Sequence, residues 1–212
     1  MRSAVLIDTG SANLRSVATA LRRVDLEPTA PTSPEQVVGA DRVVLPGVGA
    51  FGAAMDALRD QDLVEALRER CVSGRPTLAV CVGMQVLAKA SEENPGVEGL
   101  GILPAAVGRF RGALRVPHMG WNRVVAPSGV GWIETGYAYF ANSYRINEDA
   151  AEHLRAEGWE LAISDYEAGF IAAARRGGLL ACQFHPELSG DWGRALLRAW
   201  ADASSSEEVV SC

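Results

Sequence analysis

A cysteine at the end of an apolar run is the residue of this chain best placed to do chemistry. Cys81 directly follows the run Thr77–Val80 and precedes a predicted helix. Ala79 and Gly83 stand two residues to either side, where a sharp strand-to-helix turn that presents a nucleophile tolerates only small side chains. A helix start would also stabilise a thiolate. The pattern therefore favours a nucleophile over a cysteine that only fills core space.

A histidine and an acid that could activate this thiol lie near the other end of the chain. His185 and Glu187 flank Pro186 at the end of an apolar run, and extended backbone would point both side chains to one face. A thiol nucleophile needs a base, and the base needs an acceptor on its second ring nitrogen. We expect Cys81, His185 and Glu187 to form a catalytic triad. His153 lies in a polar segment and is expected on a solvated helix.

The first half of the chain predicts the elements that would hold the thiol. Apolar runs at 4–8, 42–45 and 77–80 indicate buried strands, and helices are predicted at 13–23, 51–71 and 82–90. Strands that are apolar on both faces and alternate with helices are typical of a parallel sheet covered on two sides.

The second half predicts shorter and more polar strands, followed by a final helix at 194–203. The expected fold is α/β: three layers, with a mainly parallel sheet and appended antiparallel strands, in a single domain over residues 1–203. The last residues, 204–212, have little to bury and are expected to be disordered. The predicted strands of this half are 123–125, 132–133, 137–140, 159–164, 169–174 and 179–184.

Composition excludes several classes of function. Hydrophobic residues make up 48% and charged residues 22% of the chain, as in ordinary globular proteins. A net charge of −6 disfavours binding to nucleic acid or to anionic membranes. There is no secretory signal and no apolar run long enough to span a bilayer. The four cysteines lack metal-ligand spacing, so we expect reduced thiols in the cytoplasm and neither metal nor cofactor.

Four segments together resemble a known family. Ala79–Gln85 and Phe184–Glu187 resemble the class I, or triad, glutamine amidotransferases. Pro46–Phe51 and Pro117–Asn122 are similar to the glutaminase subunits of imidazole glycerol phosphate synthase, and the second of these blocks is the most specific. The resemblance runs from about residue 4 to about residue 200.

The resemblance implies a reaction and a partner. In the family the cysteine attacks the side-chain amide of glutamine, the histidine moves protons and the acid orients the histidine. The released ammonia passes to a cyclase subunit, a (β/α)8 barrel. That subunit makes imidazole glycerol phosphate and the aminoimidazole carboxamide ribonucleotide in histidine biosynthesis. A heterodimer is therefore expected.

The remaining site residues follow from the same resemblance. The oxyanion of the intermediate would be held by the backbone N–H of Val82 and, after a peptide reorientation, by Gly49. Glutamine would be bound by Gln85 and Glu93, with backbone near Ser143 and Tyr144 closing the pocket. Glu93 could equally be a solvated helix end in Ser91–Asn94.

The block from Pro117 to Trp121 is predicted to be an arginine-rich loop. A tryptophan beside arginines is typical of an interface anchor. The resemblance to the family places the cyclase on this side, so His118, Met119 and Trp121 are expected to face it.

Three departures from the family pattern bear on the interface and on gating rather than on the triad. The first loop reads Asp8-Thr9-Gly10-Ser11-Ala12-Asn13 where the family usually has Tyr-Gly-x-Gly-Asn. Asn142 stands where histidine is usual. Leu188 stands where a lysine commonly pairs across the interface.

Other functions remain open at this stage. One is a glutaminase of the pyridoxal phosphate synthase type, although its Pro-Gly-Gly-Glu-Ser loop is missing here. A second is a catalytically silent homologue that only binds a partner, and a third is a cysteine hydrolase of similar fold.

Overall fold

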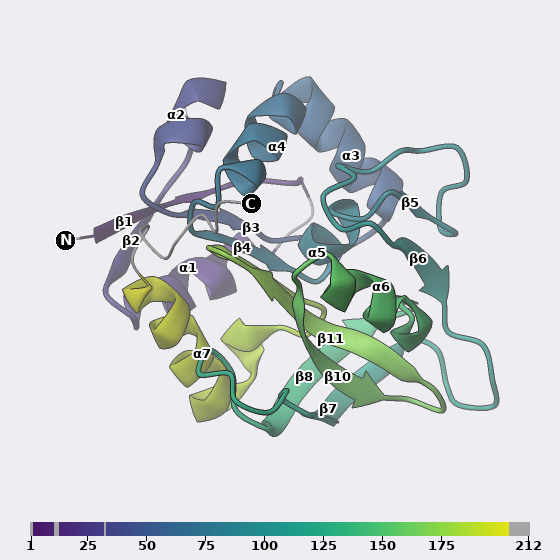
Figure 1. Ribbon diagram of the computed structural model, residues 1–212. Coiled ribbons are helices and arrows are strands. Elements are labelled where there is room, and N and C mark those ends of the chain that lie inside the picture. Colours follow the sequence, from purple (N-terminus) through teal and green to yellow (C-terminus); the bar gives the residue numbers. More distant parts are fainter. Residues whose placement is uncertain (1, 11–12, 32, 204–212) are drawn as a thin grey trace.

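The computed structural model describes residues 2–10, 13–31 and 33–203 (Figure 1). The expected disorder of residues 204–212 lies outside the described residues, as do Ser11 and Ala12 of the first loop.

A seven-stranded sheet forms the centre of the molecule, with strand order β10-β11-β12-β4-β3-β1-β2. The strands from β12 to β2 are parallel to one another, and β10 and β11 are antiparallel additions at one edge. All four residues of β4 and all four of β12 are buried, as expected of strands covered on both faces. The bounds are β1 (Arg2–Leu6), β2 (Leu26–Thr29), β3 (Val43–Leu45), β4 (Thr77–Val80), β10 (Glu160–Asp165), β11 (Gly169–Arg176) and β12 (Leu179–Cys182).

Helices cover both faces of this sheet and make the outer layers (Figure 1). One face carries α1 and α7, which contact each other, and the opposite face carries α2, α3 and α4. The expected α/β fold with a mainly parallel sheet and appended antiparallel strands is thus confirmed. The bounds are α1 (Leu14–Arg22), α2 (Pro34–Gly39), α3 (Phe51–Asp60), α4 (Val64–Val72), α5 (Val82–Val86), α6 (Ala151–Ala156) and α7 (Gly190–Asp202).

Two smaller sheets lie beyond the carboxyl ends of the parallel strands. One joins β5 (Ala90–Ser91), β6 (Ala106–Arg109) and β9 (Tyr144–Ile146). The other is a ribbon of β7 (His118–Val124) and β8 (Gly136–Asn142), joined to the main sheet where the backbone N–H of His185 donates to the Tyr139 carbonyl at 2.9 Å. This ribbon therefore positions the segment that holds the expected base.

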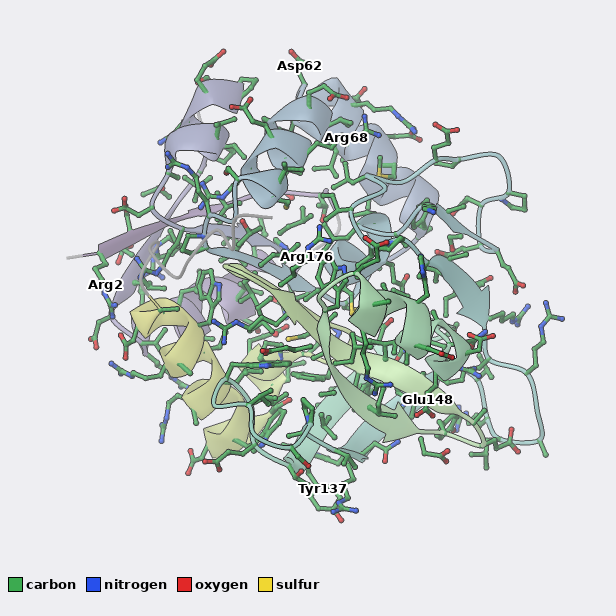
Figure 2. The ribbon with its side chains drawn as sticks, in the orientation of Figure 1. Arg2, Asp62, Arg68, Tyr137, Glu148 and Arg176 are labelled. Carbon is green, nitrogen blue, oxygen red and sulfur yellow. The ribbon has the colours of Figure 1, made fainter. Side chains whose placement is uncertain are left out.

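The single helix expected over 51–71 is wrong. Residues Phe51–Asp60 and Val64–Val72 form two helices, and Asp62 between them adopts a φ of +57°. That left-handed conformation ends the helical hydrogen-bond pattern, and aspartate tolerates it better than most residues. Asp62 lies at the surface, at the top of Figure 2.

Other differences concern the length or existence of elements. The helix after Cys81 ends at Val86 rather than near residue 90, and Trp132–Ile133 is not a strand. The segment after Pro117 is not a loop, because His118 opens β7. Short elements were not predicted at β2, α2, β5, β6 and β9. The solvated helix expected around His153 is confirmed as α6, where His153 is exposed.

None of the helices formed by residues 2–10, 13–31 and 33–203 combines the length and the hydropathy of a bilayer-spanning helix.

Candidate active site

Cys81 occupies a sharp turn between β4 and α5, as the flanking small residues predict. Its φ of +54° is unusual for a residue with a side chain, and its backbone N–H donates to the Cys182 carbonyl at 2.7 Å. A Cβ on Gly83 would collide with the Leu45 carbonyl oxygen, so only glycine fits there. Such backbone strain is retained where the surrounding structure holds it, which is typical of functional sites.

His185 and Glu187 lie at the carboxyl end of the neighbouring strand β12. His185 Nδ1 and Glu187 Oε1 are 2.8 Å apart, and both side chains are 6% exposed. The pair does not meet through extended backbone as predicted, because Pro186–Leu188 forms a 3₁₀ turn that brings the carboxylate back to the ring. The ring is therefore oriented by an acid, as a catalytic base requires.

The electrostatics of this pair favour a charged imidazole. Burial alone lowers the pKa of His185. Hydrogen bonds to Cys81 and Glu187 and their negative charges outweigh burial and raise the pKa to about 10. A protonated ring next to the sulfur stabilises a thiolate, the form in which cysteine is a nucleophile.

A cavity of about 310 Å³ opens above Cys81 and brings most of the expected site residues together. The triad acid Glu187 is not among the lining residues, because it stands behind His185. The cavity is lined by Val48, Gly49, Cys81, Val82, Gln85, Glu93, Pro117, Ala141, Asn142, Ser143, Tyr144 and His185.

The glycine loop after β3 adopts a conformation that only glycine takes readily. Gly49 has a φ of +91°, and a Cβ on Gly47 would come within 2.8 Å of the Gly83 nitrogen. The Val82 N–H points to the Gly47 carbonyl at 3.3 Å, so in this conformation the loop itself uses one of the two predicted oxyanion donors.

Glu93 is not a solvated helix end. Its Oε2 accepts from the backbone N–H of Phe51 at 2.7 Å, and Asn94 accepts from Gly52 at 2.9 Å. Helix α3 has no side-chain cap of its own, so Glu93 and Asn94 satisfy its first N–H groups. Glu93 thus touches both the cavity and the helix that follows the glycine loop.

Buried amides connect the cavity floor to the nucleophile. Gln85 Nε2 donates to the Tyr144 carbonyl and to Gln183 Oε1, both at 3.0 Å, and Gln183 Nε2 lies 3.8 Å from the Cys81 sulfur. Gln183 was not predicted as a site residue. The available signal was a polar residue placed between the apolar run 179–182 and Phe184.

An exposed apolar patch is formed by Met119, Trp121 and Tyr137 on the outward face of the β7–β8 ribbon and by Leu188 in the turn Pro186–Leu188, which contacts β8. Their exposed fractions are 64%, 58%, 60% and 44%, and Figure 2 shows Tyr137 pointing outward at the rim. Met119 pairs in register with Ala141, which lines the cavity, so the patch continues to the cavity mouth.

The expectation that His118 faces a partner is wrong. His118 is 3% exposed and stacks on Tyr166 and Phe140. Because side chains alternate along a strand, β7 sends His118 inward and its neighbours Met119 and Trp121 outward. Burial lowers the pKa of His118 to about 4, so the ring is neutral at physiological pH.

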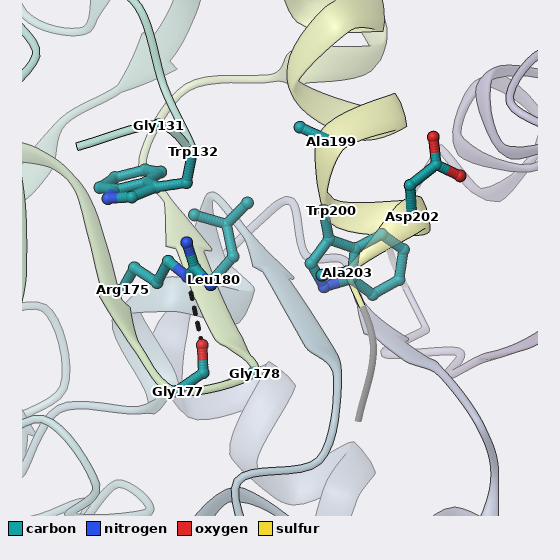
Figure 3. A pocket seen from close by; sticks show the side chains of 10 residues that line it. All are labelled: Gly131, Trp132, Arg175, Gly177, Gly178, Leu180, Ala199, Trp200, Asp202 and Ala203. Atoms are coloured by element: carbon teal, nitrogen blue, oxygen red, sulfur yellow. Dashed lines mark hydrogen bonds between the residues drawn. The ribbon is translucent and has the colours of Figure 1, made fainter. Parts of the chain in front are cut away.

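A second cavity, of about 450 Å³, is larger but lies elsewhere (Figure 3). It sits beside the turn that precedes β12, between Trp132 and the end of α7, with Arg175 and Leu180 on its wall. Among the residues that the structure describes, no cysteine or histidine lines it, so it lacks the thiol and imidazole pair of the smaller cavity. Size therefore does not identify the active site here.

Comparison with known proteins agrees with this geometry. The family model of the class-I glutamine amidotransferases matches residues 5–201. The chain belongs to this family. A solved glutamine amidotransferase superposes on 93% of this class-I chain and 98% of its own with a TM-score of 0.69 at 23% identity, which shows the shared fold.

Two curated relatives of this amidotransferase carry the same printed enzyme name. The imidazole glycerol phosphate synthase subunit HisH of Thermus thermophilus is 43% identical over 195 residues, covering 92% of this chain and 94% of the relative. The chloroplastic imidazole glycerol phosphate synthase hisHF of Arabidopsis thaliana is 39% identical over 198 residues, covering 91% of this chain. This chain spans 33% of the length of that plant protein.

Proposed function

We propose that this chain is the glutaminase subunit of an imidazole glycerol phosphate synthase and hydrolyses glutamine to glutamate and ammonia. The observation that carries the proposal is that Cys81 and His185 line one cavity, with Glu187 hydrogen-bonded to the ring of His185 behind it. The names of the curated relatives support the synthase and its place in histidine biosynthesis.

The geometry supports a two-step reaction. The Cys81 sulfur attacks the side-chain carbonyl carbon of glutamine, and the C–N bond breaks as His185 gives its proton to the departing nitrogen. The products of this step are ammonia and a thioester. His185, now neutral, takes a proton from water, which attacks the thioester; glutamate leaves, and the thiolate of Cys81 is restored beside the protonated ring. Glu187 keeps the ring oriented in both steps.

The proposed oxyanion donors are the Val82 N–H and the peptide of Gly49. Because the Val82 N–H faces the Gly47 carbonyl at 3.3 Å, the loop must move before both donors reach the intermediate. Glycines at 47 and 49 make that movement inexpensive. Gln85, Glu93 and the backbone near Ser143 and Tyr144 are proposed to hold the glutamine.

A cyclase subunit is the proposed partner, in a heterodimer, and the exposed apolar patch is the proposed docking surface. Large exposed apolar and aromatic side chains grouped on one face are typical of protein interfaces. The patch reaches the cavity mouth through Met119 and Ala141, so a docked partner would receive ammonia before it reaches water. The proposal places the chain in the cytoplasm, where a nucleophilic thiol stays reduced.

Glutamate release from glutamine tests the proposal, measured for the purified chain alone and with a co-purified cyclase subunit. We expect slow hydrolysis by the chain alone and at least about a hundredfold faster hydrolysis in the complex, since loss of one oxyanion donor costs roughly that factor. No glutamate release in either sample contradicts the proposed function. Full turnover by the isolated chain contradicts its dependence on the partner.

A further inference from the structure

Gln183 stands two residues before the base, and its side chain contacts the nucleophile. Its side chain is fully buried, with 1% of the residue exposed, although it ends an otherwise apolar run. A polar side chain in such a place costs free energy unless its hydrogen bonds are made. Its oxygen accepts from Gln85 at 3.0 Å, and its nitrogen lies 3.8 Å from the Cys81 sulfur.

The partners of these two amides determine which way each one points. The Tyr144 carbonyl can only accept, so the atom of Gln85 that faces it must be the NH₂ group. The same NH₂ group faces Gln183, which must therefore present its oxygen to Gln85. The head of Gln183 then has its NH₂ group directed at Cys81. The Tyr144 carbonyl thus fixes the orientation of the Gln85 amide, and Gln85 fixes that of the Gln183 amide next to the sulfur.

The Tyr144 carbonyl is itself held in place. Asn142 Nδ2 also donates to it at 2.9 Å, so two amides fix this acceptor. A donor directed at sulfur favours the thiolate over the thiol, since a thiolate accepts hydrogen bonds more strongly. His185 lines the same cavity as Cys81, and its interaction with the sulfur helps to raise the pKa of the ring.

We propose that Gln183 is a positioning residue for the reaction: held in one orientation by Gln85 and the Tyr144 carbonyl, its amide donates to the Cys81 sulfur and keeps the thiolate ready to attack. The role of Gln183 in the reaction rests on the proposed function, but the contacts of Gln183 with Gln85 and Cys81 do not depend on the substrate. In this arrangement both N–H groups of Gln85 donate to protein acceptors. The Gln85 oxygen can then accept from the ammonium group of glutamine.

The test is the pH dependence of Cys81 alkylation by iodoacetamide in the full chain, with the Cys81 peptide followed by mass spectrometry. Gln183→Met removes the donor and the acceptor without adding charge. Gln183→Glu keeps an oxygen towards Gln85, removes the donor and adds a negative charge next to the sulfur. We expect the Gln183→Met curve to shift to higher pH by about one unit, about tenfold slower alkylation on the rising limb, since a hydrogen bond to a charged group is worth roughly this much. The Gln183→Glu curve should shift at least as far, because its carboxylate also repels the thiolate.

Kinetics in the complex with the cyclase distinguish the contact between Gln85 and Gln183 from the contact between Gln183 and Cys81. Gln183→Glu should lower kcat about tenfold with KM within about twofold, because Gln85 keeps its partner. Gln183→Met should also raise KM about fivefold, because Gln85 is then free to turn. Gln61→Met is the matched control: Gln61 is exposed and donates only to the Asp8 and Ala57 carbonyls, so its alkylation curve should match the wild type.

Alkylation curves of both Gln183 variants that superimpose on the wild-type curve, with unchanged thermal midpoints, overturn the inference. If the Gln183 variants do not fold, Gln85→Met decides, because it releases Gln183 without altering it and should shift the curve in the same direction. If the Gln183 variants shift the alkylation curve but the wild type releases no glutamate, the positioning role of Gln183 is supported and the proposed function is contradicted.

Discussion

The two ends of the parallel strands both bury polar side chains, but with different consequences. At the amino ends, Arg70 is fully buried, and its guanidinium donates to the Thr77 hydroxyl and to five backbone carbonyls. At the carboxyl ends, Asn142 Oδ1 on the cavity wall and Glu187 Oε2 behind His185 are buried without a hydrogen-bond partner among the described residues. The carbonyls that Arg70 binds belong to Val37, Val38, Ala40, Asp41 and Pro76.

This difference separates a structural polar group from a functional one. The N–H groups of Arg70 donate to acceptors within the chain, although burial lowers the pKa of Arg70 to about 10. At the active-site end, the unpaired oxygen of Asn142 lies on the wall of the cavity. Burial or a perturbed pKa alone therefore does not identify a site, whereas a thiol and an imidazole that line one cavity do.

The largest expected effect is loss of activity without loss of stability at the carboxyl end. Cys81→Ala should lower glutamine hydrolysis by about 10⁴-fold or more, because the nucleophile is gone. Synthesis by the complex with added ammonia should continue, and the free energy of unfolding should change by less than about 1 kcal/mol. Glutamate release, ammonia-dependent synthesis and urea unfolding measure these three quantities.

Cys182→Ala is the matched control for this variant. Cys182 is fully buried one strand away, and burial raises the pKa of its thiol. Its removal should leave glutamine hydrolysis within about threefold of the wild type. Retained hydrolysis in Cys81→Ala would show that the nucleophile lies elsewhere.

The opposite result is expected at the amino end. Arg70→Met removes the donor to six acceptors, so the free energy of unfolding should fall by about 3–5 kcal/mol. The remaining folded protein should keep its kcat within about twofold. The comparison variant is Arg59→Met, whose exposed ion pair with Asp56 is worth at most about 1 kcal/mol. Similar losses of stability in both variants would contradict the structural role of Arg70.

A third prediction concerns the pH dependence of stability and the buried ring of His118. Its pKa of about 4 in the folded chain lies below the ordinary value of 6.5. The unfolded chain therefore binds the extra proton first as the pH falls below 6.5. Stability is complete above that pH and decreases towards pH 4, by about 2 kcal/mol between pH 8 and pH 5.

Urea unfolding of the wild type and of His118→Phe at both pH values measures this contribution. The substitution keeps an aromatic ring between Tyr166 and Phe140 but cannot be protonated. The carboxylate contributions are common to both proteins and cancel in the difference. Equal losses of stability on acidification would show that His118 does not cause the decrease.

The smallest expected effect lies at the proposed interface. Leu188 is 44% exposed and contributes apolar area to the exposed apolar patch. Leu188→Lys should weaken association with the cyclase by about 1 kcal/mol, part of the value of a fully buried leucine. We expect no acid opposite this position, since an unpaired buried carboxylate would cost several kcal/mol. Affinity measured against ionic strength tests this, and tighter binding of the lysine variant at low salt would refute it.

Much of the fold follows from the sequence because the parallel strands are continuous apolar runs. The break between α3 and α4 does not, because neither glycine nor proline marks it in the sequence, and Asp62 alone changes the backbone conformation there. Helix α2 was missed since only Val37 among its residues is buried. Tertiary contacts decide such short elements, and local pattern does not.

The site was predictable where a motif carries the chemistry and unpredictable where distant contacts do. Cys81, His185 and Glu187 stand in recognisable local patterns. Glu93 reaches a helix start 42 residues away, and Gln183 gains its neighbours only when β12 pairs with β4. The inward direction of His118 was missed because its segment was taken for a loop, so strand alternation was not applied to it.

The place of β12 also sets the order in which the newly made chain becomes reactive. Gln183 lies 102 residues after Cys81, and β12 is the last strand made. At ribosomal speeds of roughly 5–20 residues per second, Cys81 waits about 5–20 s for its base and its amide neighbour to be synthesised. A product truncated before β12 therefore carries a thiol without the groups that activate it, and nucleophilic strength is the last property this chain acquires during its synthesis.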